Sequence, residues 1–350
     1  MAVIDSDTHI VEGPEIWTHV RPEDEAFRPL TITADRESRH AYTSGGREFW
    51  MIDGQMYGRG GQPSEQYAEG TRDLTNIAAR IADMDRFGHD LQVIYPSLFL
   101  NLWCRSVDAE RAAIRAYNSW MAEVCGTTNG RMRFVALPVV RDFQASKEEI
   151  TKAKENGACG IQLRGYEGDA ALDNPEMEPF FALACDLDLP VCIHIGNGSP
   201  AYASIKNSRT GLRNVLGNSM PTLISFAALT LARIPDKFPQ LRIGFIEAAS
   251  EWVPFAVHRC RKMLKHYGVK DSTENLFSDN RFYVTCEASE DVNAVARVTG
   301  PDSILVGTDY GHADTATELE APRLLRERED LTEDLVERIV DANPRKFYAL

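Results

Sequence analysis

Residues 3–12 read VIDSDTHIVE, with Asp5, Asp7 and His9 at every second position between apolar residues. Alternate side chains of a β-strand share one face, so this spacing predicts a strand whose three polar side chains point the same way. On the protein surface such a face has no cost. In the interior it needs a cation, because carboxylates in close contact repel each other.

Seven further apolar runs follow this first one, and each is short and mostly continuous, as buried parallel strands are. Helix-like segments separate the runs. The eight predicted strands are Ala2–Ile4, Leu91–Tyr95, Arg133–Leu137, Gly160–Leu163, Pro190–Ile195, Leu241–Ile246, Arg281–Thr285 and Ser303–Val306. The predicted helices are Ile77–Phe87, Asp108–Cys125, Phe143–Asn156, Pro175–Leu187, Leu212–Ile234, Glu251–His266, Glu290–Thr299 and Thr332–Phe347. Strand and helix alternating in this way predict an α/β fold, a (β/α)8 TIM barrel.

One segment interrupts the alternation. Residues 17–75 are rich in Gly, Arg and aromatic residues, and they predict a β-hairpin insertion after strand 1. No linker separates a second domain, so we expect residues 1–350 to form a single unit. The insertion is a candidate lid over the mouth of the barrel, with Arg47, Trp50 and Tyr57 available to close it.

Composition excludes several classes of protein. The formal net charge of −14 argues against nucleic acid as the main partner, since phosphate binding needs a basic surface. The seven cysteines show no C-x-x-C pair, which fits a reducing compartment. No signal peptide and no apolar stretch of the roughly 20 residues that span a bilayer is apparent. These features predict a cytoplasmic protein without a membrane partner.

The ends of the predicted strands carry a concentrated set of acids and histidines. Barrel enzymes place their chemistry at the carboxyl ends of the strands, and imidazole and carboxylate are ligands that suit zinc, manganese or iron. His194 alone also fits a core histidine, and Asp309 alone also fits a helix N-cap. Together these strand-end residues predict a metal site in their neighbourhood. The strand-end acids and histidines are Asp7, His9, His194, Glu247, Glu287 and Asp309.

Six stretches make the chain similar to a known family. They are VIDSDTHI (3–10), ADMDRFGHDLQVIYPS (82–97), AYNSWMAEVCGTTNGRMRFVALP (116–138), LPVCIHIG (189–196), LVGTDYGH (305–312) and NPRKFYAL (343–350). In these stretches the chain resembles the amidohydrolase superfamily, in the branch with aminocarboxymuconate-semialdehyde decarboxylase and the resorcylate- and carboxyvanillate-type decarboxylases. The resemblance extends over nearly the whole chain.

The resemblance implies one divalent metal, zinc before manganese or iron, with Asp7, His9, His194 and Asp309 as its ligands. Asp5 is either a support for these ligands or a plain hydrogen-bond acceptor at the strand end.

The sequence departs from the family at the end of strand six. Decarboxylase-like relatives commonly have a histidine there, whereas this chain has Glu247, in the stretch FIEAASEW (245–252). A carboxylate there serves as general base, general acid or further ligand, or pairs with an arginine. The catalytic candidates are Glu247, Asp309 and His312, and a second metal near Glu247 and His312 is not excluded.

Arg164 at the end of strand four is the candidate partner of a substrate carboxylate, because a guanidinium binds carboxylates through two parallel hydrogen bonds. Its alternative is a salt bridge to Glu167 or Asp169. Large aromatic residues after strands two, six and eight are candidates for a substrate pocket or, alternatively, core anchors. They are Tyr95, Trp252 and Tyr310, with Trp103 beside them.

These features favour a metal-dependent non-oxidative decarboxylase of a small aromatic or cyclic carboxylate, which is its small-molecule partner. Three alternatives stay open: a hydrolase of an amide, lactone or C–C bond with metal-activated water, a dinuclear-metal oxygenase, and a non-catalytic subunit of a hetero-oligomer. By resemblance we expect a homo-oligomer, a dimer or tetramer.

Overall fold

The computed structural model describes residues 2–33, 48–59, 64–196, 219–269, 275–313 and 315–350, with the single positions 212 and 216. Eight parallel strands form one sheet in the order β1-β5-β6-β7-β10-β11-β12-β13. Their bounds are β1 Ile4–His9, β5 Leu91–Tyr95, β6 Met132–Ala136, β7 Ala158–Arg164, β10 Val191–His194, β11 Ile243–Ile246, β12 Phe282–Cys286 and β13 Ile304–Val306. The predicted TIM barrel is confirmed.

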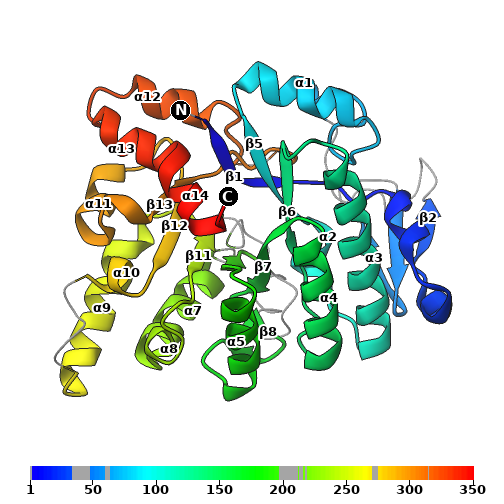
Figure 1. The fold of residues 1–350 in the computed structure, drawn as a ribbon, viewed down its shortest axis with the longest axis horizontal. Helices are drawn as coiled ribbons and strands as arrows, with labels where there is room; N and C mark the ends of the chain where they lie inside the picture. The colour runs from blue at the N-terminus through cyan, green and yellow to red at the C-terminus, as the bar shows by residue number, and fades with distance from the viewer. Residues whose placement is uncertain are drawn as a thin grey trace.

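Helices surround the barrel (Figure 1). They are α1 Ile77–Phe87, α2 Leu98–Asn101, α3 Val107–Gly126, α4 Phe143–Glu155, α5 Glu178–Asp186, α7 Ser219–Leu231, α8 Ile234–Lys237, α9 Trp252–His266, α10 Leu276–Asp279, α11 Val292–Thr299, α12 Ala321–Glu327, α13 Glu333–Glu337 and α14 Asn343–Tyr348. Side-chain N-caps start several of them, for instance Asn76 on α1 and Asp142 on α4. Among the described helices, none has both the length and the apolar character needed to cross a membrane.

Two predicted helices differ most from the observed ones. The beginning of the predicted helix Leu212–Ile234 lies largely outside the described residues, and α7 starts at Ser219. The predicted helix Thr332–Phe347 is divided into α13, a π-helical turn over Arg338–Ala342 and α14. Pro344 lies in the first turn of α14, where its missing N–H breaks the regular hydrogen-bond pattern.

The interior of the barrel is closed by the C-terminal helix. Phe347 and Tyr348 of α14 belong to the buried cluster that fills the barrel, together with residues of β1, β5, β6, β7, β10, β11, β12 and β13. Tyr348 donates its hydroxyl proton to the carbonyl of Ser6 at 2.8 Å, and its oxygen lies 2.8 Å from the hydroxyl of Tyr95. This packing leaves the opposite end of the barrel, at the carboxyl ends of the strands, for chemistry.

Strand β1 contains a bulge that separates Asp5 from Asp7 and His9. Asp5 pairs with Gln92 on β5, whereas His9 pairs with Tyr95, and the register shifts between Asp5 and Thr8. Two residues of β1 therefore oppose Val93, which exchanges the faces of the strand. The expectation that all three polar side chains share a face is wrong for Asp5, which lies on the Gln92 face beside His89 and Thr308.

The segment after β13 joins β1 and completes the barrel. The amide of Asp309 donates to the carbonyl of Asp7 at 3.0 Å, and the amide of His9 donates to the carbonyl of Tyr310 at 2.5 Å. On the outer face, the Asp5 carboxylate accepts hydrogen bonds from the amide and the hydroxyl of Thr308. Asp7, His9 and Asp309 are thus held side by side by backbone hydrogen bonds.

The inserted segment after β1 begins with two 3-10 helices, η1 Pro14–His19 and η2 Pro22–Phe27, and continues in a three-stranded antiparallel sheet, β2 Leu30–Thr33, β3 Glu48–Ile52 and β4 Gln55–Gly58. Trp50 is buried against Trp17, and Tyr57 donates its hydroxyl proton to the carbonyl of Trp103 at 2.8 Å. In Figure 1 the sheet lies beside α3. Arg47 lies outside the described residues, and a lid function stays a prediction.

Close packing of β13 against β1 depends on Gly307, where a Cβ atom would overlap the Cβ of Asp7. We expect Gly307→Ala to lower the free energy of unfolding by about 1–3 kcal/mol, the usual cost of overpacking. Urea unfolding measures this change. Gly126→Ala is the matched control, because a Cβ there meets no atom within 4 Å and alanine favours the helix. Equal stability of the two variants would contradict the prediction.

Candidate active site

Two buried imidazoles at the carboxyl end of the barrel have a fixed tautomer. Nδ1 of His9 lies 3.0 Å from the carbonyl oxygen of Pro96, and Nδ1 of His194 lies 3.0 Å from that of Ile195. A carbonyl oxygen only accepts, so each Nδ1 carries the proton. In a neutral imidazole the lone pair is then on Nε2.

In the neutral rings, both Nε2 lone pairs face carboxylate oxygens. Nε2 of His9 lies 3.4 Å from Asp7 Oδ1 and 3.3 Å from Glu247 Oε2. Nε2 of His194 lies 3.3 Å from Asp7 Oδ1 and 3.1 Å from Glu247 Oε2. Ligands about 2.1 Å from one ion lie about 3.4 Å apart in a tetrahedron and about 3.0 Å apart in an octahedron. The four distances match the edges of a coordination shell.

Two polar atoms at the centre of this cluster lack hydrogen bonds, whereas His194 Nε2 and Asp7 Oδ1 lie within hydrogen-bond distance of each other. Among the described residues, His9 Nε2 and Glu247 Oε2 are buried without a hydrogen-bond partner. Buried polar groups are otherwise almost always paired, because an unpaired one costs about 1–3 kcal/mol. Lone pairs and negative charges that face one another in a buried site are stabilised by a cation between them. Asp7, His9, His194 and Glu247 therefore fit a divalent metal.

Asp309 lies on the far side of His9. Its Oδ1 is 3.7 Å from His9 Nε2 and 2.6 Å from Nδ1 of His312. It belongs to a second set of candidate ligands with His9, Glu247 and His312, and no set among the described residues contains all four predicted ligands together. Glu247 stands in the first set instead of Asp309, and Glu287 stands in neither. The assignment of each ligand stays a prediction.

Glu247 and Asp309 both have left-handed backbone conformations, with φ of 57° and 52°. Such angles are uncommon outside glycine and carry strain that the surrounding structure must offset. Glu247 directly follows β11 and Asp309 lies three residues after the end of β13, and both carboxylates lie at the mouth of the barrel. Strain of this kind is concentrated at functional sites, which supports a role for both carboxylates.

Burial and neighbouring charges raise the pKa values of Glu247 and His9 and lower that of Asp7. Burial raises the pKa of Glu247 well above its usual value, and the charge on Asp309 adds to this shift. Burial also acts to raise the pKa of Asp7, but His194 and His9 outweigh it and hold that pKa below its usual value. Burial acts to lower the pKa of His9, but Asp7 and Asp309 outweigh it, so the pKa is raised.

Three supporting residues were not found from the sequence. Glu12 is buried and accepts hydrogen bonds from the amides of Ser97 and Leu98 at 2.8 and 2.9 Å. The hydroxyl of Ser97 contacts His312, and that of Thr317 donates to Asp309 Oδ2 at 2.8 Å. Glu12 lies three residues after His9, and this closeness in the sequence is the one signal that could have indicated its role.

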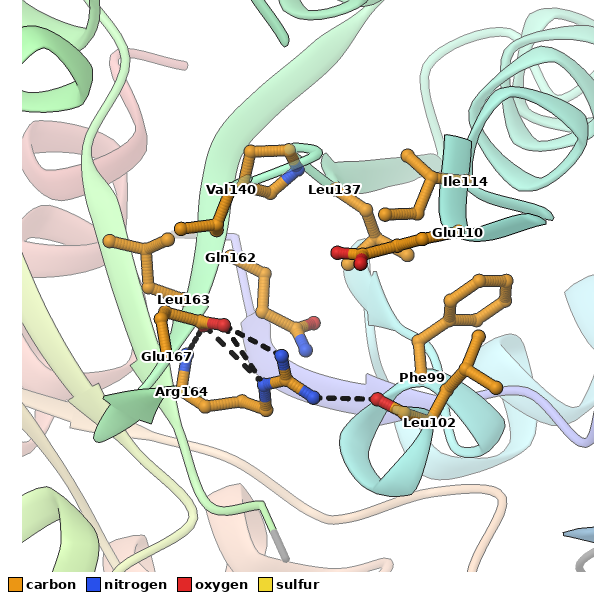
Figure 2. Close-up of a pocket in the computed structure, with 11 residues that line it drawn as sticks. Phe99, Leu102, Glu110, Ile114, Leu137, Val140, Gln162, Leu163, Arg164 and Glu167 are labelled. Atoms are coloured by element: carbon orange, nitrogen blue, oxygen red, sulfur yellow. Dashed lines mark hydrogen bonds and ion pairs between the residues drawn. The ribbon is translucent and has the colours of Figure 1, made fainter. Parts of the chain in front are cut away.

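Arg164 forms a salt bridge with Glu167. Its guanidinium contacts the Glu167 carboxylate, with Nη2 2.6 Å from Oε2, and Nη1 donates to the carbonyl of Leu102 at 2.7 Å. Figure 2 shows this pair at one wall of a small cavity that Glu110 and Gln162 also line. The alternative pairing with Glu167 is therefore present, and recognition of a substrate carboxylate by Arg164 stays a prediction.

The three candidate pocket aromatics have the contacts of packing residues. Tyr95 is fully buried inside the barrel below His194, with 4.9 Å between ring centroids. Tyr310 is also fully buried, donates to Asp83 at 2.6 Å and lies under the guanidinium of Arg80. Trp252 packs on Phe226 and Phe245. A substrate contact by any of them has no support in these interactions and stays a prediction.

An eight-stranded parallel barrel with histidines and carboxylates gathered at its carboxyl end defines a TIM-barrel enzyme with a candidate metal centre. Residues 4–350 match the family model described as Amidohydrolase. The chain belongs to the amidohydrolase family, as the sequence motifs predict.

Several relatives share the fold or the sequence. An amidohydrolase from Mycobacterium avium subsp. paratuberculosis superposes with a TM-score of 0.81 at 18% identity, over 99% of each chain. The 5-carboxyvanillate decarboxylase of Novosphingobium aromaticivorans, solved with manganese, gives a TM-score of 0.74 at 21% identity, over 100% of this chain and 97% of that one. The decarboxylase orsB of Emericella nidulans is 23% identical over an alignment of 256 residues, which covers 66% of this chain and 74% of that protein.

Removal of one imidazole should release the ion. We expect His194→Ala to weaken Mn²⁺ binding more than about 100-fold, since even residues that only orient ligands contribute 10–100-fold. Equilibrium dialysis with elemental analysis measures the bound metal. His19→Ala is the control, because His19 pairs with the exposed Glu123 away from the barrel mouth. Wild-type metal content in His194→Ala would contradict this site.

Burial raises the pKa of Asp5 from 3.8 to about 7, against the opposing hydrogen bonds from Thr308. The folded protein then keeps a proton that the unfolded chain releases, so stability is lost as pH rises from about 4 to 7. A pKa difference of three units between the folded and unfolded states corresponds to a change of at most about 4 kcal/mol in the free energy of unfolding. We expect this fall to be absent in Asp5→Asn. Urea unfolding of the metal-free proteins at several pH values measures it, and parallel curves for the two proteins would refute the assignment.

Proposed function

We propose that this chain is a metal-dependent non-oxidative decarboxylase of a small aromatic or cyclic carboxylate. The observation that carries the proposal is the buried cluster in which the His9 and His194 lone pairs face Asp7 and Glu247. Two relatives support the reaction: a fungal decarboxylase, and a 5-carboxyvanillate decarboxylase solved with manganese and a nitrobenzoic acid ligand.

In this reaction the bond between a ring carbon and the carboxylate carbon breaks, carbon dioxide leaves, and the ring carbon keeps the electron pair and takes up a proton. A divalent ion would supply an electrophilic anchor for the substrate carboxylate and a neighbouring oxygen. Asp7, His9 and His194 would hold that ion. The protein's own task is then to deliver one proton to the ring carbon.

Glu247, which in this role carries a proton and is not a ligand of the ion, is the candidate proton donor. Burial and the charge on Asp309 raise the pKa of Glu247, so its carboxyl group keeps a proton at a higher pH than an exposed glutamate would. A bound cation opposes this shift, since positive charge favours the carboxylate. Asp309 and His312, 2.6 Å apart, are the other candidates for holding or moving the proton.

Hydrolysis is the second candidate, favoured by Glu247 at the end of strand six. The same carboxylate, once ionised, could accept the proton of a water molecule instead of donating one to carbon. The two reactions differ in whether carbon dioxide is released. Zinc, manganese and iron all suit the mixed imidazole and carboxylate donors, and the native metal stays a prediction.

Release of carbon dioxide tests the proposal. We expect the manganese-loaded protein to decarboxylate members of a panel of hydroxybenzoates, and chelation to abolish the activity. Glu247→Gln keeps the size of the side chain but removes its acid, and we expect at least about a 100-fold lower kcat, as general acid catalysis contributes 10²–10⁴-fold. Exposed Glu251→Gln, four residues further on, is the control. Hydrolysis of amide or lactone substrates without carbon dioxide release would favour the second candidate.

A further inference from the structure

Two adjoining cavities lie at the carboxyl ends of β6 and β7, on the side of α3 and the short hairpin of β8 Tyr166–Glu167 and β9 Ala170–Ala171. The inner cavity has a volume of about 40 Å³ and the outer cavity one of about 420 Å³. No residue that lines them belongs to the candidate metal sets of the described chain. Four residues line both cavities, which therefore share a wall: Glu110, Val140, Arg164 and Glu167.

Gln162 of β7 directs its amide into the inner cavity (Figure 2). The residue is only 3% exposed, and among the described residues nothing donates a hydrogen bond to its Oε1. Buried amide oxygens nearly always have a partner, because an unpaired one has lost its hydration without compensation. The inner cavity therefore has room for a hydrogen-bond donor beside Gln162.

The carboxylate of Glu110, on α3, projects into the same cavity (Figure 2). Arg141 donates to its Oε2 from Nε at 2.9 Å and also from Nη2, while within the described part of the chain no hydrogen bond reaches Oε1. Burial raises the pKa of the Glu110 carboxyl although Arg141 opposes the shift, so this charge is incompletely compensated. The inner cavity thus presents two acceptors, Oε1 of Gln162 and Oε1 of Glu110.

The two arginines of the cavities are already paired. Arg164 contacts Glu167 through Nη2 at 2.6 Å and donates from Nη1 to a main-chain carbonyl at 2.7 Å. Arg141 pairs with Glu110 in the same way and donates from Nη2 to another main-chain carbonyl at 2.6 Å. Their donors are therefore used within the protein, whereas the two acceptors of the inner cavity are not.

The charge of the lining residues is negative in sum. Three acids and two arginines line the cavities, so one negative charge remains in excess, and a positive ligand is attracted there while a negative one is repelled. The five charged residues are Glu110, Glu167, Asp169, Arg141 and Arg164.

Size limits what the inner cavity can hold. A cavity that binds one benzene ring has a volume of about 150 Å³, so about 40 Å³ admits a head group of a few atoms and no ring. The outer cavity has the volume of a small-molecule site. Apart from its polar groups, the inner cavity is apolar, with walls that include Phe99, Ile114, Leu137 and Leu163.

We propose that these cavities bind a primary alkylammonium ligand, at a site separate from the candidate metal centre. The ammonium group lies between Oε1 of Gln162 and Oε1 of Glu110, and the alkyl chain leads along the apolar wall into the outer cavity beside Trp103. An ammonium group has three N–H donors and one positive charge, which match the unused acceptors and the excess negative charge. A hydroxyl group has one donor and no charge, and a carboxylate has neither a donor nor the right charge.

Three ligands of equal chain length test the proposal on the full chain: n-butylammonium, 1-butanol and butyrate. Isothermal titration calorimetry at pH 7 measures each Kd. We expect one n-butylammonium per chain, bound about tenfold or more tightly than 1-butanol, because hydrogen bonds that involve a charged group are the stronger ones. We expect no binding of butyrate.

Two variants locate the bound ammonium group. Gln162→Met keeps the length of the side chain but removes the amide acceptor, and Glu110→Gln keeps its size but removes the charge. We expect each to raise the Kd for n-butylammonium about tenfold or more. Gln144→Met is the matched control, since Gln144 is exposed on α4 and lines neither cavity.

Urea unfolding shows whether the variants are folded. If Glu110→Gln is unstable because Arg141 has lost its ion pair, Gln162→Met alone decides the result. None of these measurements uses catalysis, so the site and the proposed function stand or fall separately.

Tightest binding of n-butylammonium, lost in Gln162→Met and retained in Gln144→Met, supports the site. No binding of n-butylammonium, or equal binding in Gln162→Met and the wild type, overturns it. Equal affinities for n-butylammonium and 1-butanol overturn the role of charge. Preferred binding of butyrate overturns the proposal as well, and favours Arg164 as the partner of a carboxylate.

Discussion

The structure of the site depends on lone pairs that face negative charge. Backbone carbonyls accept hydrogen bonds from the Nδ1–H groups of His9 and His194, so in the neutral rings the opposite edge presents a lone pair to the carboxylates of Asp7 and Glu247. That arrangement is repulsive in a buried site and becomes attractive around a cation. The orientation of the two imidazoles is thus determined by hydrogen bonds to main-chain carbonyls, which lie behind the rings on the side away from the carboxylates.

The same main chain joins the two ends of the barrel. Asp309 and Tyr310 continue from β13 along β1 by hydrogen bonds to Asp7 and His9, so the contacts that close the barrel also position the residues of the site. Arg80 adds to this junction from outside, where it lies over the Tyr310 ring and donates to the His9 carbonyl. A change that loosens this junction would disturb donors from both ends of the chain.

The barrel could be predicted because most of its strands are largely apolar runs, and Leu91–Tyr95 agrees with β5 residue for residue. The first strand differs, because β1 covers Ile4–His9 and the predicted strand covers Ala2–Ile4. The positions of Asp7, His9, His194 and Glu247 at the ends of predicted strands also indicated that these four residues lie close together, as they do in the structure. The sequence did not reveal the bulge in β1, since nothing in a period of two marks an extra residue. Nor did it show Ser97 and Glu12, whose roles arise from backbone contacts between segments far apart in the chain.

The bulge in β1 has a consequence for how this strand can vary. Before it, Ile4 points into the barrel and Asp5 points out; after it, His9 points in. The extra residue shifts the phase of the strand, so that two acids two positions apart serve different sides of the wall. Loss of a single residue between them would restore regular pairing and rotate one partner out of place. A deletion here therefore changes which side of the wall a whole stretch of side chains faces.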